Sequence, residues 1–216
     1  MKIRNKLYEA VGEGDVESLR ELLDISNQKE HYGELLSIAV THNFLEIVTL
    51  LLEHQANPNH ITSEKSKETL LFSAVRSCTV PLITKLLEYK ADINKQNDDG
   101  KTVLHCKVNV ADLALVKLLL EHQANPNIQD NRGNTPILYT KFDTMFRLLL
   151  EHNADIDLQN KAGDSIRSIL EDPTLSKYNS HLSKLLNDYL IEQLQNIKVA
   201  DEGVVVTELG SVNICE

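Results

Sequence analysis

The chain has 216 residues, of which 42% are hydrophobic, 25% charged and only 5% aromatic, and its formal net charge is −10. Because an acidic surface repels phosphate backbones, this composition argues against a nucleic-acid partner. No apolar run approaches the roughly 18 to 20 residues that a membrane-spanning helix needs, and the basic N-terminus lacks the apolar core of a secretory signal. We therefore expect a cytoplasmic monomer that does not bind membranes.

The sequence contains no complete catalytic, metal-binding or cofactor-binding motif. Its three cysteines, Cys78, Cys106 and Cys215, are far apart, which argues against a disulfide framework or a zinc site. The nucleophile elbow, the phosphate-binding loop, the zinc-protease helix motif and the dinucleotide fingerprint are all missing. The acidic turn at residues 97–100 is not followed by the glutamate that a calcium loop needs. We expect a protein that is not an enzyme and that binds no metal and no cofactor.

The N-terminal segment, residues 5–24, carries apolar side chains three and four positions apart, interrupted by the glycines Gly12 and Gly14. This spacing predicts two short helices joined by a glycine turn. We assign residues 1–31 to an N-terminal capping repeat.

A ten-residue segment, LLLEHQANPN, occurs at Leu50–Asn59 and again, unchanged, at Leu118–Asn127. Weaker copies occupy Leu86–Asn94 and Leu148–Asp157. The alanines that follow the four leucine runs are spaced by 35, 33 and 30 residues, and a period near 33 indicates a stacked array of repeats. Each leucine run forms the second, more apolar member of a pair of predicted helices. We assign four repeats, to residues 32–66, 67–98, 99–131 and 132–162.

Polar turns separate the later repeats. Thr102 and Thr135 suit the N-cap position of the next helix, and Pro136 suits its first turn, where a missing N–H costs nothing. The turns contain three glycines that can adopt a positive φ, namely Gly100, Gly133 and Gly163.

These units resemble ankyrin repeats. The best matches are Thr102 to His105 (TVLH), Thr135 to Leu138 (TPIL) and Glu46 to Leu52 (EIVTLLL), and the resemblance covers roughly residues 5–165. It implies an all-α repeat fold, an ankyrin-type solenoid of helix-turn-helix units with projecting loops. It also implies that His105 braces its turn through hydrogen bonds.

The chain departs from the ankyrin pattern in three ways. Ankyrin repeats usually have glycine just before the alanine that follows the leucine run, but this chain has Gln55, Lys90, Gln123 and Asn153 there. If these residues are left-handed, the backbone strain costs about 1 kcal/mol at each position. Two extra residues before Thr69 predict a longer loop at residues 61–67. Three missing residues after Thr135 predict a shortened helix or turn near Phe142 and Asp143.

Beyond Gly163 the repeat pattern decays. Asp172 and Pro173 should end a helix that starts near Ser165. Apolar residues between Leu182 and Ile197 keep helical spacing, so residues 163–197 are assigned to a degenerate repeat and C-terminal capping helices, with docking to a partner as the alternative role. Residues 198–216 are assigned to a mobile tail.

Three histidines, His54, His122 and His152, occupy one slot near the ends of the longer helices. Stacked helices lie about 10 Å apart, which is too far for one metal ion to bridge. A histidine near a helix C-terminus is favoured by the helix dipole, so we interpret these residues as structural.

The leucine-rich faces are used in stacking, which leaves the projecting loops and first helices free to bind. We therefore expect a non-catalytic protein–protein interaction scaffold that binds a protein partner through a concave loop and first-helix surface. Tyr32, Arg132 and Tyr139 are the best hot-spot candidates. The family's contact slots, carried over, give this full set: Tyr32, Leu35, Ile38, His42, Phe44, Lys67, Glu68, Leu70, Ser73, Ser77, Asp99, Lys101, Val103, Val110, Arg132, Asn134, Tyr139 and Phe142.

Two alternative roles remain open. One is a stoichiometric inhibitor of a single enzyme or factor. The other is a microbial effector acting in a host cell; the unchanged ten-residue duplication suggests recent repeat expansion, and long ankyrin arrays are common among such effectors. The resemblance also implies possible hydroxylation at Asn59, Asn94 and Asn127; the alternative is that these asparagines only hydrogen-bond the turns.

Overall fold

The computed structural model describes residues 2–25, 29–77, 79–110, 112–172, 184–189 and 191. Its coordinates form two units, residues 1–168 and residues 169–216. Within the second unit, residues 184–189 are helical. Most of the predicted C-terminal cap and all of the predicted tail lie outside the described residues.

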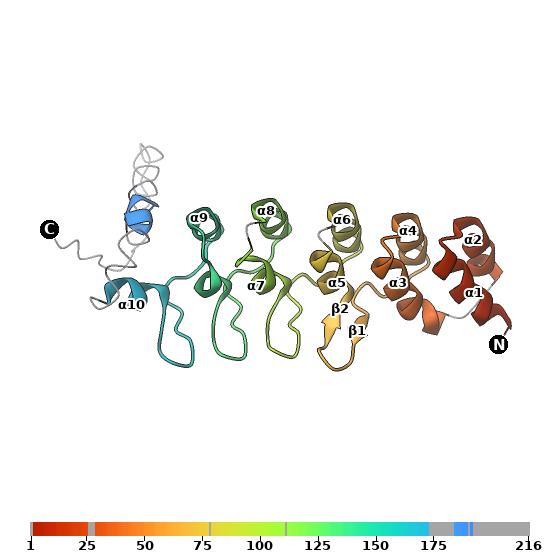
Figure 1. Ribbon diagram of the computed structural model, residues 1–216, viewed down its shortest axis with the longest axis horizontal. Coiled ribbons are helices and arrows are strands. Elements are labelled where there is room, and N and C mark those ends of the chain that lie inside the picture. Colours follow the sequence, from red (N-terminus) through yellow and green to blue (C-terminus); the bar gives the residue numbers. More distant parts are fainter. Residues whose placement is uncertain are drawn as a thin grey trace, which may run out of the picture. The chain divides into compact units, whose positions relative to one another are not determined.

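The first unit is a row of helix pairs. Figure 1 shows the second helices in one row and the first helices in another, with the loops projecting to one side of each pair. In the first four pairs, each first helix packs against its own second helix and against the first helix of the next pair. The first helices are α1 (Lys2–Glu13), α3 (Tyr32–Thr41), α5 (Leu70–Arg76), α7 (Val103–Lys107) and the 3-10 helix η2 (Pro136–Tyr139). The second helices are α2 (Val16–Ile25), α4 (Leu45–Glu53), α6 (Val80–Glu88), α8 (Leu113–Glu121) and α9 (Asp143–Glu151).

Two shorter elements flank this row. The 3-10 helix η1 (Lys29–His31) precedes α3, and α10 (Ile166–Glu171) follows the last loop. The end of α10 at Glu171 agrees with the stop predicted at Asp172 and Pro173, because proline disfavours the helical conformation of the residue before it. In the part of the chain that is described, no helix has both the length and the apolar character needed to cross a bilayer.

The two copies of the duplicated segment lie in equivalent surroundings. Leu51 in α4 and Leu119 in α8 are both 0% exposed, and the alanines Ala56 and Ala124 are both buried at the ends of their repeats. The leucine periodicity therefore specifies the buried faces on which the row of repeats is stacked, as the repeat interpretation predicted.

Side-chain amides join successive repeats at the base of the loops. The Oδ1 atoms of Asn59, Asn94 and Asn127 accept from backbone N–H groups of the next repeat at 2.7, 2.8 and 2.7 Å. Their Nδ2 atoms donate to backbone carbonyls of the next repeat at 3.4, 3.4 and 2.9 Å. Each asparagine thus satisfies one donor and one acceptor of the next turn, which fixes the register of the stack.

The helix starts follow the predicted chemistry in one repeat and depart from it in another. Thr102 and His105 form the capping box of α7. Thr135 is the N-cap of η2 and Pro136 lies in its first turn, but the Thr135 side chain makes no capping bond and its Oγ1 is buried without a hydrogen-bond partner. The reason is local, because Leu138 occupies the position that His105 has in the previous repeat. Leucine has no polar atom that could hydrogen-bond the threonine at the N-cap, as the His105 Nδ1 does with Thr102.

The length differences act where the sequence predicted. The three missing residues reduce the first helix of the repeat at residues 132–162 to the short 3-10 helix η2. The longer first loop forms an antiparallel hairpin of β1 (Ile61–Ser63) and β2 (Glu68–Thr69), a feature that the helical pattern did not predict. Lys67 lies in the turn between these two strands and has a positive φ of 51°.

The glycine-like slots before the alanines are left-handed, as expected. The φ angles of Gln55, Lys90, Gln123 and Asn153 are 70°, 66°, 66° and 62°. Gly100, Gly133 and Gly163 also have positive φ, at 74°, 80° and 89°. A side chain with a Cβ atom is strained in this region, whereas glycine is not.

Gln123→Gly should therefore raise the free energy of unfolding by about 0.5–1 kcal/mol, the strain relieved less the added backbone entropy of glycine. Gln123 is preferable to Gln55, because the Gln55 Oε1 accepts a hydrogen bond from Lys29. Urea unfolding measures the change, and Gln123→Ala is the control because it removes the same side chain but keeps the Cβ strain. Equal stability of the two variants would show that the strain is negligible.

Candidate partner-binding surface

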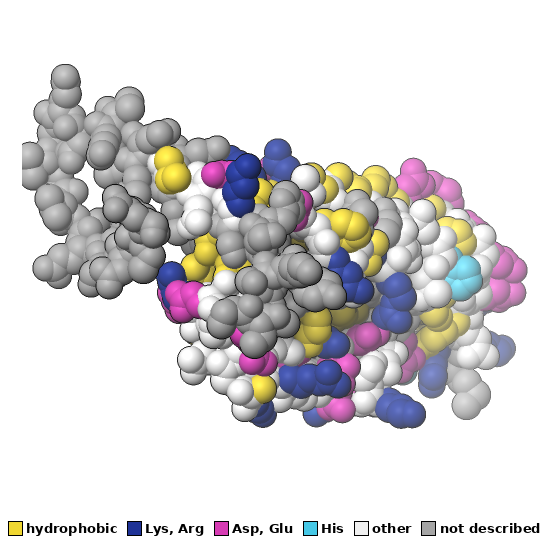
Figure 2. Space-filling model, turned by 60° about the vertical axis from the view of Figure 1, so that its left-hand side comes forward, with side chains coloured by type: hydrophobic (Ala, Val, Ile, Leu, Met, Phe, Trp, Pro, Cys, Tyr) yellow, Lys and Arg dark blue, Asp and Glu magenta, His cyan; other side chains and the backbone are white. Residues whose placement is uncertain are grey.

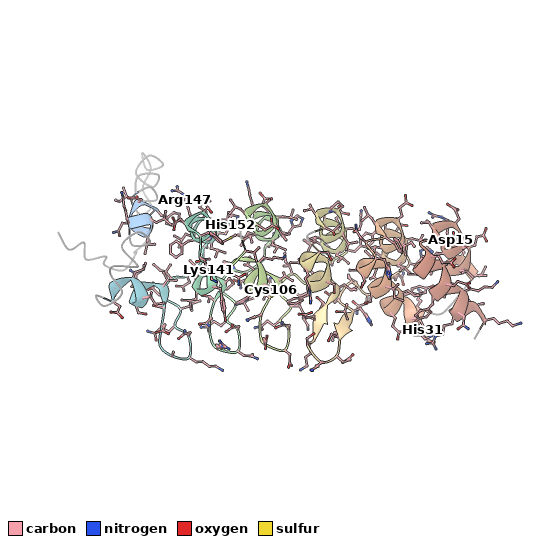
Figure 3. All side chains as sticks on the ribbon, viewed as in Figure 1. Asp15, His31, Cys106, Lys141, Arg147 and His152 are labelled. Atoms are coloured by element: carbon pink, nitrogen blue, oxygen red, sulfur yellow. The ribbon has the colours of Figure 1, made fainter. Side chains whose placement is uncertain are left out.

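The first helices present a repeating line of accessible side chains. Ile38, Ser73, Cys106 and Tyr139 occupy equivalent positions on α3, α5, α7 and η2, and all four are half-buried or exposed. We call these four residues the first-helix strip. Figure 2 shows one face of the molecule, on which hydrophobic, basic and acidic side chains are interspersed. Figure 3 shows Cys106 on this row of helices, away from Arg147 and His152 on the row of second helices.

Four of the expected contact residues are not on the surface. Leu35 and Leu70 are fully buried, Val103 is 1% exposed and Tyr32 is 2% exposed. These side chains lie at the starts of α3, α5 and α7 and are enclosed in the stack. The expectation that they contact a partner directly is therefore corrected, and Tyr32 is no longer a hot-spot candidate.

The other fourteen expected residues remain accessible to different degrees. Half of them are half-buried: Ile38, Phe44, Glu68, Ser73, Lys101, Asn134 and Tyr139. The other half are exposed: His42, Lys67, Ser77, Asp99, Val110, Arg132 and Phe142. The large apolar side chains among the exposed residues, Val110 at 48% and Phe142 at 42%, both lie in turns that follow a first helix.

Tyr139 is held in place by a polar network. Its hydroxyl donates to Asp130 Oδ2 at 2.5 Å and accepts from Asn134 Nδ2 at 3.1 Å. The Lys101 Nζ lies 5.3 Å from the centre of the Tyr139 ring, within the range of a cation–π contact. Desolvation acts to raise the pKa of Asp130, but hydrogen bonds from Tyr139 and the backbone N–H groups of Asn134 and Arg132 lower it overall. Because the ring is anchored, Tyr139 can contact a partner with little loss of conformational entropy.

His105 braces the turn, as the resemblance implied. Its Nδ1 accepts from the Thr102 backbone N–H at 3.1 Å, and its Nε2 donates to the Asn134 carbonyl of the next repeat at 3.1 Å. Burial lowers the pKa of His105, although the Asn134 carbonyl acts in the opposite direction. The neutral imidazole therefore joins two repeats beneath the first-helix strip.

Cys106 is a surface residue that the sequence analysis left out of the contact set. Its thiol is free and exposed. Desolvation by the surrounding repeats raises the pKa of this thiol, and the charge of Lys101 opposes that shift. The signal was present in the sequence, because Cys106 follows Thr102 by the same number of residues as Tyr139 follows Thr135.

The asparagines considered for hydroxylation lie in the inter-repeat amide contacts described above. Asn59, Asn94 and Asn127 are half-buried, and both polar atoms of each side chain are hydrogen-bonded. These contacts agree with the structural interpretation of the three residues. Their hydroxylation stays a prediction.

The repeated histidines cap the ends of second helices. The Nδ1 atoms of His54, His122 and His152 bond the carbonyls four residues earlier at 2.8, 2.9 and 2.9 Å. Each ring therefore adds a hydrogen bond to a carbonyl in the last helical turn. The carbonyls of Leu50 and Leu118 also accept the backbone N–H of His54 and His122. Among the described residues, no group of three or more His, Cys, Asp or Glu side chains is placed to hold a metal ion.

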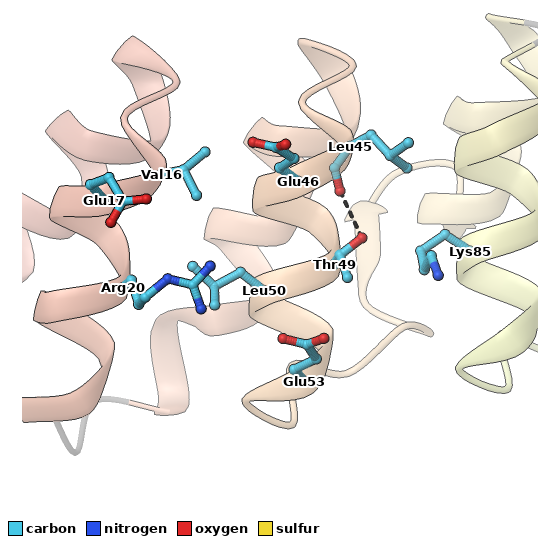
Figure 4. A pocket seen from close by; sticks show the side chains of 9 residues that line it. All are labelled: Val16, Glu17, Arg20, Leu45, Glu46, Thr49, Leu50, Glu53 and Lys85. Atoms are coloured by element: carbon cyan, nitrogen blue, oxygen red, sulfur yellow. Dashed lines mark hydrogen bonds between the residues drawn. The ribbon is translucent and has the colours of Figure 1, made fainter.

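A hollow lies on the row of second helices. It has a volume of about 400 Å³ and lies between α2, α4 and α6; Figure 4 shows the side chains that line it. Its charged lining residues are Glu17, Arg20, Glu46, Glu53 and Lys85. The one hydroxyl in the lining, Thr49 Oγ1, donates to the Leu45 carbonyl at 2.9 Å, and no histidine lines the hollow to act as its base.

The paired helices, the left-handed turns and the lateral loops define a class of stacked-repeat proteins. A family model that describes three consecutive ankyrin repeats matches the chain twice, at residues 7–97 and at residues 71–160. The chain therefore belongs to the ankyrin repeat family.

Individual relatives agree with this assignment. Ankyrin repeat and SOCS box protein 11 of the mouse, Mus musculus, is 32% identical over 110 residues. This match covers 49% of the chain but only 33% of the mouse protein. The chain thus spans about a third of the length of this relative.

Solved structures share the fold. The ankyrin repeat domain of Bcl-3, a unique member of the IkappaB protein family, is 27% identical with a TM-score of 0.64, over 74% of this chain and 76% of that one. The ankyrin repeat protein EF0377 is 24% identical with a TM-score of 0.65, over 85% of this chain and 97% of that one. The second likeness concerns the fold alone.

Proposed function

We propose that this protein is a non-catalytic scaffold that binds a protein partner through the first-helix strip and the loops beside it. Ankyrin repeats are protein–protein interaction modules. The observation that supports this face most is the line of four accessible side chains in equivalent register on successive first helices. Such a line offers one contact per repeat to an extended partner surface.

The edge of this surface offers apolar anchors. Val110 and Phe142 are exposed at the ends of α7 and η2, and half-buried Phe44 follows α3. Aromatic and apolar side chains that a partner fully covers contribute most of the binding free energy of an interface. Anchored Tyr139 lies three residues before Phe142 and adds an amphipathic contact.

The double variant Val110→Ser/Phe142→Ser should weaken capture of the partner at least tenfold, because hot-spot truncations cost about 2 kcal/mol or more. Folding should persist, since both side chains are exposed and serine at position 142, the N-cap of α9, is a favourable cap. The measurement is affinity capture by the full chain from a cell extract, followed by titration of the captured protein against each variant.

The matched control is Val80→Ser/Leu113→Ser, which removes two exposed apolar side chains from the starts of second helices α6 and α8. This control should retain the captured protein. Loss of capture in the control, together with normal capture by Val110→Ser/Phe142→Ser, would place the binding surface on the second helices and contradict the proposal.

The roles of stoichiometric inhibitor and microbial effector stay predictions. Full inhibition of a captured enzyme at equimolar scaffold would separate inhibition from tethering. Delivery of the tagged chain into host cytosol is the corresponding test for an effector.

A further inference from the structure

We propose that the segment from Thr135 to Phe142 is a conformational switch, which opens and closes while the helix pairs around it stay folded. The segment contains η2 and the turn before α9. It carries Tyr139 and Phe142, two residues of the proposed binding surface, so its opening changes what that surface presents to a partner. The opening itself is a property of the chain alone and does not rest on the proposed function.

Among the first helices, η2 buries the fewest side chains. Its buried residues are Pro136 and Ile137, whereas α3 and α5 bury five residues each. The helices α1 and α7 bury three each. Because the free energy of burial grows with the apolar area removed from water, detaching η2 exposes less apolar surface than detaching any other first helix.

A buried hydroxyl at the start of η2 opposes the closed arrangement. Thr135 is 1% exposed, and among the described residues its Oγ1 has no hydrogen-bond partner. In α7 the equivalent Thr102 Oγ1 lies 2.9 Å from the His105 Nδ1, but Leu138 occupies the histidine position in η2. A buried polar group without a partner destabilises the state that buries it, and exposure to water removes that penalty. Opening is therefore more favourable here than at α7.

Two hydrogen bonds that stabilise the previous repeat have no counterpart in this segment. His105 Nε2 donates to the Asn134 carbonyl of the next repeat at 3.1 Å, whereas Leu138 has no polar side-chain atom. Asp112, the N-cap of α8, accepts a backbone N–H at 3.2 Å. The Phe142 side chain makes no such bond at the start of α9. Both ends of the segment are thus less firmly held than their equivalents in the repeat before it.

Tyr139 anchors the closed arrangement. Its hydroxyl donates to Asp130 Oδ2 and accepts from Asn134 Nδ2, and Lys101 lies over its ring. Each of these hydrogen bonds contributes only a modest net free energy, because water replaces the partner in the open arrangement. When η2 detaches, these contacts break and the Tyr139 side chain is released. The binding surface therefore has an anchored and a released form of one aromatic side chain.

The structure on both sides of the segment can stay folded while it opens. Before the segment, the Asn131 backbone N–H donates to the Asp99 carbonyl of the previous loop at 3.0 Å. After it, α9 buries Phe146 and Leu149 and packs against α8. Figure 3 marks Lys141, within the segment, on the row of first helices. Such uneven stability allows a short element to open at a lower free energy than global unfolding requires.

Amide hydrogen exchange of the full chain, labelled with nitrogen-15 and followed by NMR, tests the switch. The reporter amides are those of Leu138 and Thr140, which are hydrogen-bonded within the segment. After correction for intrinsic rates, they should exchange at least tenfold faster than the hydrogen-bonded amides of Val108 and Val110 in the previous repeat. Their exchange should also respond little to low urea concentrations, because local opening exposes little surface.

Equal exchange rates in the two repeats would overturn the proposal. A urea dependence at Thr140 as steep as that at Val108 would also overturn it, because the segment would then open only together with the whole row. The measurement needs no partner, so its outcome is separate from that of the capture experiments.

The variants Leu138→His and Thr135→Val test the cause of the opening by two routes. The first supplies the imidazole that caps α7, and the second removes the unpaired hydroxyl with little change of shape. At about pH 7.5, where an imidazole is neutral, each should slow exchange at Thr140 several-fold. Slower exchange in either variant supports the proposal. Unchanged exchange in both would overturn it.

Each variant has a matched control. Leu138→Met changes the same side chain without adding a capping group, so exchange at Thr140 should stay within twofold of the parent chain. Thr102→Val should speed exchange at Val108, because the hydroxyl at that position has a partner to lose. If Leu138→Met slows exchange as much as Leu138→His does, and Thr135→Val has no effect, the missing cap is not the cause and the proposal is wrong.

Discussion

Leu119→Ala is expected to lower the free energy of unfolding by about 2–5 kcal/mol, the range for removing a buried leucine and leaving a cavity. Leu119 is 0% exposed in the middle of α8, which packs against α7 and α9. Because a domain is stable by only about 5–15 kcal/mol in total, the variant should unfold at a much lower urea concentration. The loss should spread to the neighbouring repeats, since each repeat is stabilised by the next.

The duplicated segment supplies an internal comparison. Leu51→Ala removes the equivalent side chain from the identical ten-residue sequence in α4, where Leu51 is also 0% exposed. Its cost should fall in the same range. The surface control is Glu121→Gln at the exposed end of α8, where the ion pair with Lys117 spans 3.9 Å and should contribute less than about 0.5 kcal/mol. A cost below about 1 kcal/mol for Leu119→Ala would contradict a close-packed stack.

His105→Ala should destabilise the protein by about 2–3 kcal/mol. It removes an acceptor for the Thr102 N–H and a donor to the Asn134 carbonyl, and a buried group left without its partner costs about 1–3 kcal/mol. The bond from the Thr102 N–H is the half of the capping box that the imidazole supplies. Urea unfolding at pH 8 measures the total, and His122→Ala, which removes an exposed imidazole from the end of α8, is the control.

The same residue predicts a pH dependence. In the folded state burial lowers the pKa of His105, whereas an unfolded histidine titrates near pH 6.5. Between these two pKa values the unfolded chain binds a proton that the folded chain does not. Protonation of His105 should therefore leave the free energy of unfolding unchanged above about pH 6.5 and should lower it as the pH decreases below that value.

Unfolding curves at pH 8 and pH 5.5 test this sign. The difference in stability between the parent chain and His105→Ala should be smaller at pH 5.5, because the variant has no imidazole to protonate at this position. The same comparison with His122→Ala corrects for the general loss of an imidazole. A difference that grows on acidification would show that the folded state favours the charged ring.

Much of the fold could be predicted because its signals are local and repeated. The leucine spacing of α4 and α8, the left-handed slots at Gln55 and Gln123, and the capping pair of Thr102 and His105 are each set within a few residues. The hairpin of β1 and β2 was missed, because its strands are only three and two residues long and its polar sequence has no strand periodicity.

The candidate surface could be predicted only in part. The contact slots included exposed residues such as Val110 and Phe142, but also buried Leu35, Leu70 and Val103. At the start of a first helix, a side chain that is outward in an isolated helix is covered by the neighbouring repeat. Cys106 was missed for the opposite reason, since a cysteine reads as a buried residue unless its register is compared across repeats.

The amino-acid sequence alone determined the repeat period, the helix pairs, the left-handed turns and the absence of a recognised catalytic motif, because these depend on residue type and short-range spacing. Only the tertiary structure decided which side chains of the first helices reach the surface and which of them bond across to the next repeat, as His105 does to the Asn134 carbonyl. Burial and electrostatic proximity depend on residues about 30 positions apart that stacking brings together, and no local pattern contains that information.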